Sequence, residues 1–256
     1  MARDFDGSAD YLLYSGVPVS AYPFSLACWV YADDVSTSPF FFQFGDSASA
    51  TTRAGLNFDS AGKLGAQVSS PSGTRSWYTT AGASTGVWVH CAGTFTNSST
   101  CLSYLDGVST GAYLGTASPA FPTLNRTSIA VLPRSSLSNY LNGRVAEAAI
   151  WNTTLSQDEV SMLAAGYSPL LVSPQSLVAY WPLFGRAGAA GNEEGWVGGQ
   201  VMSQTSSPAV IDHPRIIFPR RRVITPYQAA AGSLPTLTGI TLSNITTSGY
   251  RATVTA

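Results

Sequence analysis

The chain has 256 residues, 45% of them hydrophobic and 11% charged, and its 13 basic and 14 acidic residues leave a net charge of −1. This composition excludes an intrinsically disordered chain, which combines low hydrophobicity with high charge. It also provides no general attraction to nucleic acid or to an anionic membrane, and no apolar run reaches the roughly 18 residues of a membrane-spanning helix. The first residues, MARDFDGSADY, lack the pattern of a signal peptide, so we expect synthesis and folding in a cytoplasm.

Short β-rich runs separated by Gly, Pro, Asn and Ser follow one another from the N-terminus. A polar turn at residues 97–99 is expected to place Cys101 near Phe95, and Asp106-Gly107 marks a tight turn. This spacing of short strands is typical of an antiparallel sandwich or barrel. The expected strands are residues 24–31, 40–44, 56–58, 64–68, 87–95, 101–105, 128–132, 145–151 and 177–183.

The segment LSQDEVSMLAAGYSP predicts one short helix. Ser156 and Glu159 have the spacing of a capping box, in which each side chain binds the backbone N–H of the other residue. Val160 and Leu163 lie on one apolar face, and Gly166 is suited to the left-handed position that ends a helix.

The three cysteines, Cys28, Cys91 and Cys101, all lie in apolar runs. An odd number argues against a disulfide framework. A thiol in an apolar run behaves as a small hydrophobic side chain. We therefore expect three free thiols in the core.

The composition changes after residue 184. Residues 185–233 are rich in Gly, Pro and Arg without a clean period, which predicts an extended arm. Residues 234–256 predict a tail of two strands, which cannot bury a core alone and must pair with another chain or with the main body. The arm holds a cluster of basic and interleaved apolar residues that favours a protein groove over nucleic acid, so we expect these residues to anchor the chain to neighbouring subunits: Arg215, Ile216, Ile217, Phe218, Arg220, Arg221 and Arg222.

Six segments in register resemble the laminin-G-like, concanavalin A-like lectin/glucanase superfamily. Any one of them is a weak signal, whereas six in the expected order cover about the first 184 residues. The segments are FDGSADYL (5–12), PFSLACWVYAD (23–33), GVWVHCAGTF (86–95), LSYLDGV (102–108), LNGRVAEAAIWNTTLSQDEV (141–160) and SLVAYWPL (176–183).

This resemblance implies an all-β, antiparallel jelly-roll β-sandwich over residues 1–184 with one short helix. The extended arm (185–233) and the short β tail (234–256) follow it and lie outside the resemblance. The layout is similar to that of bacteriophage structural proteins. We therefore expect a non-catalytic virion protein, such as a capsid decoration, displayed at the virion surface and anchored to other virion proteins or to copies of itself. The alternative is a carbohydrate-binding adhesion module for host-surface glycans.

Relatives that hydrolyse glycosides use two carboxylates about 5–5.5 Å apart. Glu147 lies in an expected strand, but Val145, Ala149 and Trp151 on its expected face offer no second carboxylate. Glu193-Glu194 is explained by a solvated loop. No enzyme activity is therefore expected.

Metal binding has little support in the residue spacing. His90 matches a structural strand residue of the family, and with His213 as the second histidine a zinc site lacks ligands. Many relatives bind Ca²⁺, so Ca²⁺ stays open, although no cofactor is required. The aspartates in turns have a conformational role that explains them, and none has the dense spacing of a calcium loop: Asp33, Asp34, Asp46 and Asp59.

Sugar binding would use an exposed aromatic ring among polar groups. Trp77, Tyr78, Tyr113 and Tyr140 lie in polar surroundings and are the candidates for stacking on a sugar. Each is equally explained as a packing or interface residue, and the sequence does not choose among them.

Overall fold

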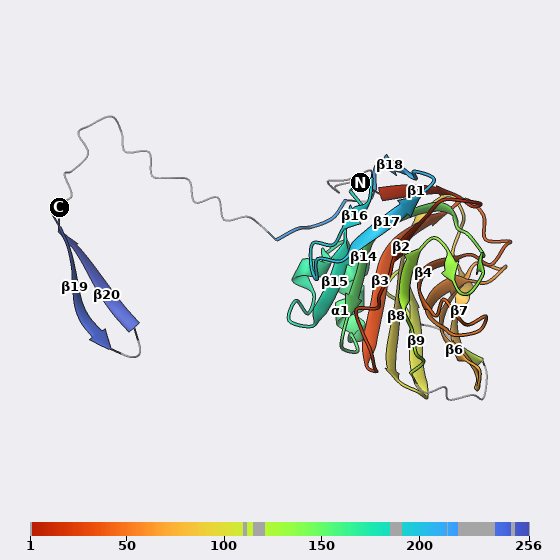
Figure 1. Cartoon of the computed structure of the whole chain (residues 1–256), viewed down its shortest axis with the longest axis horizontal. Coiled ribbons are helices and arrows are strands. Elements are labelled where there is room, and N and C mark those ends of the chain that lie inside the picture. The colour runs from red at the N-terminus through yellow and green to blue at the C-terminus, as the bar shows by residue number, and fades with distance from the viewer. Residues whose placement is uncertain are drawn as a thin grey trace. The chain divides into compact units, whose positions relative to one another are not determined.

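The computed structural model describes residues 2–109, 112–114, 121–184, 191–213, 215–219, 239–246 and 249–255, and all counts below refer to these. Of residues 112–114, 239–246 and 249–255 only the backbone is described. The chain divides into two units, Met1–Pro219 and Arg220–Ala256. The second unit contains the hairpin of β19 (Gly239–Thr246) and β20 (Gly249–Thr255), whose strands pair with each other (Figure 1).

Two large antiparallel sheets form the first unit (Figure 1). The strands of the seven-stranded sheet are β1 (Ala2–Asp6), β3 (Phe24–Ala32), β8 (Trp88–Asn97), β9 (Thr100–Leu105), β14 (Asn142–Trp151), β15 (Leu177–Trp181) and β18 (Ala209–Ile211). They follow the order β18-β1-β14-β3-β8-β9, and β15 pairs with β14.

The strands of the nine-stranded sheet are β2 (Tyr11–Tyr14), β4 (Phe40–Gly45), β5 (Arg53–Phe58), β6 (Lys63–Ser70), β7 (Gly73–Gly82), β10 (Ala112–Leu114), β11 (Arg126–Ile129), β16 (Glu193–Glu194) and β17 (Val201–Thr205). They follow the order β10-β7-β6-β5-β4-β11-β2-β17-β16, and a small hairpin of β12 (Leu132–Pro133) and β13 (Leu137–Ser138) is separate from both sheets. This arrangement confirms the predicted all-β sandwich with a jelly-roll fold.

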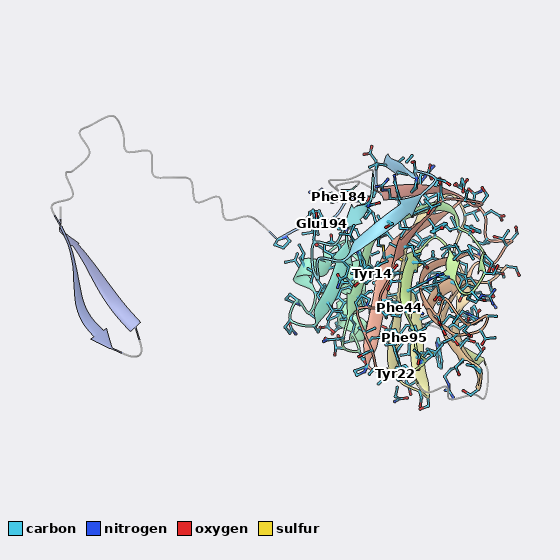
Figure 2. The ribbon with its side chains drawn as sticks, in the orientation of Figure 1. Tyr14, Tyr22, Phe44, Phe95, Phe184 and Glu194 are labelled. Atoms are coloured by element: carbon cyan, nitrogen blue, oxygen red, sulfur yellow. The ribbon has the colours of Figure 1, made fainter. Side chains whose placement is uncertain are left out.

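Aromatic side chains fill the space between the two sheets. The ring of Phe24 stacks on Phe95 of its own sheet at 4.3 Å between centroids, and lies 5.8 Å from Phe44 of the other sheet. Figure 2 labels Phe44 and Phe95 within the sandwich. All three side chains are fully buried. Burying a side chain of this size contributes about 1.5–3 kcal/mol, so this contact joins the sheets strongly.

The cysteine prediction is confirmed. Cys28, Cys91 and Cys101 are free and buried, and Cys101 lies opposite Phe95 in the β8–β9 register, as the turn at residues 97–99 predicts. Burial raises the pKa of all three thiols.

The predicted helix is α1 (Gln157–Ala164), and a short 3₁₀ turn follows at Pro169–Leu171. Its capping box is present as expected: the Ser156 side chain accepts the Glu159 N–H, and Glu159 accepts the Ser156 N–H at 2.7 Å. Its buried residues, Val160 and Leu163, pack with Trp151 in a second apolar cluster on the outer face of the seven-stranded sheet. No helix among the described residues has the length and hydropathy to cross a membrane.

The range expected as an extended arm contains three strands that join the sandwich. β17 pairs with β2, β18 pairs with β1, and β16 pairs with β17. The described residues up to Pro219 thus lie with the sandwich in one unit. Short strands of polar and small residues have little hydrophobic period, which is why composition alone indicated an arm.

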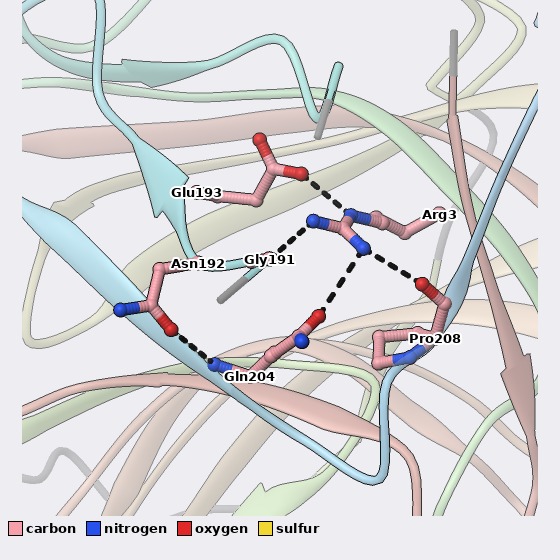
Figure 3. A network of polar contacts seen from close by, with 6 residues as sticks. All are labelled: Arg3, Gly191, Asn192, Glu193, Gln204 and Pro208. Atoms are coloured by element: carbon pink, nitrogen blue, oxygen red, sulfur yellow. Dashed lines mark hydrogen bonds and ion pairs between the residues drawn. The ribbon is translucent and has the colours of Figure 1, made fainter. Parts of the chain in front are cut away.

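A buried ion pair holds these strands to the N-terminus (Figure 3). Arg3 Nε lies 2.5 Å from Glu193 Oε1, and the two side chains are 4% and 2% exposed. The guanidinium also donates to the carbonyls of Gly191 and Pro208 and to the Gln204 side chain. The expectation that Glu193 lies in a solvated loop is therefore wrong, although Glu194 is exposed.

We expect Arg3→Met to lower the free energy of unfolding by about 3–5 kcal/mol, because it leaves the Glu193 carboxylate buried without its cation. Chemical denaturation of the full chain measures this loss. The double variant Arg3→Met/Glu193→Met removes both charges and should recover most of it. A double variant no more stable than Arg3→Met would contradict the account.

Candidate functional site

The outer face of the nine-stranded sheet is polar. Side chains alternate along a strand, so Leu64, Ala66 and Val68 of β6 face the core while Gln67 and Ser69 face outward. The outer face of the seven-stranded sheet differs, because α1 and its apolar cluster cover it. We define the polar face as the outward side chains of Phe40, Gln43, Arg53, Asn57, Gln67, Ser76 and Tyr78, with Arg134 beside them.

Two glycines let larger side chains lie flat on the polar face. A Cβ at Gly65 would meet the Tyr78 ring at 2.6 Å, so this ring covers Gly65. A Cβ at Gly55 would lie 2.8 Å from Cδ of Gln43, and its φ of +150° is strained for other residues. The Tyr78 ring and the Gln43 amide can occupy these positions because Gly65 and Gly55 have no side chains.

Two amide oxygens on the polar face are buried and have no hydrogen-bond partner among the described residues, Oε1 of Gln43 and Oδ1 of Asn57. Their amide nitrogens are fixed: Gln43 Nε2 donates to the Leu56 carbonyl at 2.8 Å, and Asn57 Nδ2 donates to the Tyr78 hydroxyl at 3.3 Å. Unpartnered buried acceptors cost free energy, and both oxygens lie beneath the surface of the polar face rather than on it.

A chain of hydrogen bonds crosses the same face. Arg53 Nε donates to Gln67 Oε1 at 2.7 Å, and Gln67 Nε2 donates to the Ser76 hydroxyl at 2.7 Å. The guanidinium of Arg53 lies over the Phe40 ring, 5.7 Å from its centroid. These contacts hold the side chains in one arrangement before any ligand arrives.

The structure separates the four predicted aromatic residues. Tyr78 lies on the polar face, whereas Trp77, next to it, packs against the core between the sheets. Tyr140 packs against Tyr11 with 6.2 Å between centroids. Tyr113 lies opposite Trp77 in the β10–β7 register, and its side chain is outside the described part.

The predicted anchoring residues that are described pack on their own chain. Ile217 accepts the Ser168 N–H at 2.9 Å and donates to Gly166 at 2.7 Å, and the Phe218 ring lies 6.1 Å from that of Trp196. Arg215 and Ile216 belong to the same segment, and Ile216 lies beside Glu147. The remaining predicted residues, Arg220, Arg221 and Arg222, lie outside the described residues.

Glu147 occupies a β-bulge that the sequence did not reveal. The β14–β3 register shifts between Ala146 and Ala149, and Glu147 has a φ of +57°. A bulge interrupts the alternation of a strand, so Val145 faces the sandwich core while Ala149 faces the helix side. The expectation that both share one face with Glu147 is therefore wrong.

The Glu147 carboxylate is buried. Tyr180 donates its hydroxyl to Oε2, and His213 Nε2 lies 3.7 Å from Oε1. Burial raises the pKa of Glu147 to about 7, although the Tyr180 hydrogen bond opposes the shift. Burial lowers the pKa of the nearby His90 to about 3, so this histidine is neutral.

The expected turn role of the aspartates fits their contacts. Asp46 accepts the Ala48 N–H, Asp59 accepts the N–H groups of Ala61 and Lys63, and Asp34 accepts that of Ser36. Within the described ranges, no group of three His, Cys, Asp or Glu side chains is placed to hold a metal ion.

A hollow of about 470 Å³ lies between residues 15–20 and 121–125. Among the described residues its lining is uncharged, and its aromatic ring, Phe121, packs edge-on against Tyr22 and Phe24. The polar face therefore offers more recognition chemistry than this hollow.

The model of the concanavalin A-like lectin/glucanases superfamily matches residues 6–161, and the chain belongs to this family. Comparison with curated proteins finds no match. Three solved structures are similar in fold. A proposed carbohydrate binding protein of Bacteroides ovatus has a TM-score of 0.60 at 16% identity, over 84% of this chain and 60% of that one, so this chain spans less than two thirds of its length.

The second structure is the CBM40 of a Ruminococcus gnavus IT-sialidase bound to α2,3 sialyllactose, with a TM-score of 0.52 at 11% identity over 64% of this chain and 98% of that one. The third is a heptameric SAP-like pentraxin of Limulus polyphemus, with a TM-score of 0.52 at 13% identity over 64% of this chain and 81% of that one. Likeness at these identities shows the fold, which is that of lectin-like carbohydrate-binding modules.

We expect Glu147 to make the stability depend on pH. Its pKa is about 7 in the folded chain against 4.5 as the ordinary value. Its contribution is therefore complete below pH 4.5 and is lost as the pH rises through 7, an effect of about 3 kcal/mol. Denaturation midpoints measured between these values should fall with pH in the wild type and vary much less in Glu147→Gln. An equal fall in both proteins would show that another group is responsible.

Proposed function

We propose that this protein is a non-catalytic carbohydrate-binding module that holds a glycan on the polar face of its nine-stranded sheet. The observation that carries the proposal is the contrast between the two outer faces. Helix α1 covers one, whereas the other carries the half-buried aromatic ring of Tyr78 among polar side chains. A sugar can stack its apolar ring face on the aromatic ring and direct its hydroxyl groups to the polar side chains.

The family and the carbohydrate-binding neighbours support this proposal over the other reading from the sequence. The proposal that the protein is non-catalytic rests on the surroundings of Glu147, the carboxylate that the sequence places in a strand. Glu147 is surrounded by Tyr180 and His213, and no second described carboxylate forms an ion pair or hydrogen bond in that cluster. Retaining and inverting hydrolysis both use a second carboxylate, about 5–5.5 Å away in retaining and about 6.5–9.5 Å away in inverting enzymes.

Display on a virion stays our prediction from the sequence. Its sequence support is the β tail and the basic residues Arg220–Arg222 of the second unit. Glycan binding and a place on a virion surface are compatible, because the polar face belongs to the first unit alone. Copurification of the chain with particles, lost after deletion of residues 220–256, would support it.

We expect Tyr78→Ala to weaken glycan binding by at least about tenfold, because an aromatic residue at the centre of a contact carries much of its energy. A glycan array with the full chain identifies a ligand, and calorimetry then measures the affinity. Tyr78→Phe keeps the ring and should retain most of the binding.

Two matched changes serve as controls. Tyr140→Ala removes a candidate ring away from the polar face, and Thr123→Trp fills the hollow beside Phe121. Both should leave the affinity unchanged. Binding that survives Tyr78→Ala but fails in Thr123→Trp would move the site to the hollow, and no binding to any glycan on the array would refute the proposal.

A further inference from the structure

Two arginine side chains are fixed next to each other at one loop beside the polar face. Arg53 Nη1 donates to the Thr51 carbonyl at 3.2 Å, and Arg134 Nη1 donates to the adjacent Ala50 carbonyl at 2.6 Å. The chain thus brings a guanidinium from β5 and one from the β12–β13 hairpin to neighbouring carbonyls. We call Arg53 and Arg134 the arginine pair.

The arginine pair has no described anionic partner. Among the described residues, Arg3 pairs with Glu193, Arg144 with Asp4 and His213 with Glu147, and none of these ion pairs includes Arg53 or Arg134. Burial, and then the positive charge of Arg134, lower the pKa of Arg53. Two like charges in a partly buried place repel each other, so a bound anion would relieve an unfavourable arrangement.

Hydrogen bonds fix both guanidiniums, but some of their N–H groups have no acceptor among the described residues. Arg134 is held by Ala50 and by the Ser138 hydroxyl at 3.2 Å, while its Nε is buried without a partner in the described part of the chain. Arg53 uses Nε and Nη1 for Gln67 and Thr51, which leaves Nη2 for a ligand. A planar guanidinium fixed in this way suits the paired oxygens of an anionic group.

We propose that the arginine pair binds the negatively charged group of an acidic saccharide, a carboxylate or a sulfate, while the sugar ring lies over Tyr78. This deepens the proposed function and rests on it. The Arg53–Gln67–Ser76 hydrogen bonds and the register of β5, β6 and β7 connect the cations to the rest of the polar face. The Tyr78 ring on the same face gives a sugar an apolar surface to stack on, which favours a saccharide over a simple anion.

The experiment compares acidic sugars with neutral forms of the same saccharide backbone. The full chain is titrated by calorimetry with oligogalacturonate and its methyl ester, and with a sulfated galactan oligosaccharide and its desulfated form. We expect at least one acidic member to bind about tenfold to a hundredfold more tightly than its neutral counterpart, the range for a charge-assisted hydrogen bond. The pair that shows the difference identifies carboxylate or sulfate as the group.

Arg53→Gln and Arg134→Gln should each weaken binding of the acidic sugar far more than binding of its neutral counterpart, and so remove most of that preference. Arg75→Gln is the matched control, because Arg75 lies on β7 opposite the core residue Val68 and donates to the Ser99 carbonyl, on the other side of the strand from Tyr78. It removes the same charge and should retain the preference. Arg134 lies in the small hairpin outside the sheets, so its variant keeps the test decisive if Arg53→Gln does not fold.

Equal binding of acidic and neutral members, or a preference that persists in both arginine variants, overturns this inference. In either case, the proposed function would stand if the chain binds a neutral sugar and Tyr78→Ala abolishes that binding. Absence of binding by every member of both pairs and by the array overturns the two together.

Discussion

The buried contact between Arg3 and Glu193 joins the first strand of the sandwich to strands that come late in the first unit. β1 lies between β14 and β18, so it cannot leave its place without breaking both pairings. β16 carries Glu193 at the edge of the nine-stranded sheet and pairs with β17, which in turn pairs with β2. One side chain near the N-terminus thereby connects β1 of one sheet with β16 and β17 of the other, about two hundred positions later in the chain.

Helix α1 explains why the two outer faces of the sandwich differ. The chain leaves β14 directly into the capped helix, which returns over the seven-stranded sheet and buries Trp151 and Tyr180 beneath it. In the nine-stranded sheet, β17 and β16 extend one edge, and the outer face carries polar side chains. The covering helix thus lies on one outer face, and the proposed glycan-binding site lies on the other.

Local signals in the sequence were sufficient for local structure. The capping box of Ser156 and Glu159 and the turn that pairs Cys101 with Phe95 depend on residues a few positions apart, and both were predictable. The bulge at Glu147 was not, because it appears only when β14 is aligned with β3. The same holds for the arginine pair, whose members are far apart in sequence and meet through two adjacent carbonyls.

The candidate site shows the same limit. Tyr78 and Trp77 are neighbours with similar surroundings in the sequence, yet strand alternation sends one to the surface and the other to the core. Which of the two faces outward depends on register, and a shift by one residue would exchange them. Aromatic composition could therefore name the candidates without choosing between them.

The cross-strand position of Cys28 and Cys91 has a practical consequence. Their backbones are direct partners between β3 and β8, in the middle of the sheet and away from solvent. Because thiolates, not thiols, react with alkylating agents, these sulfurs stay inert while the sheet is closed. The rate at which a maleimide modifies them reports how often this sheet opens, so the chain carries its own internal reporter of unfolding.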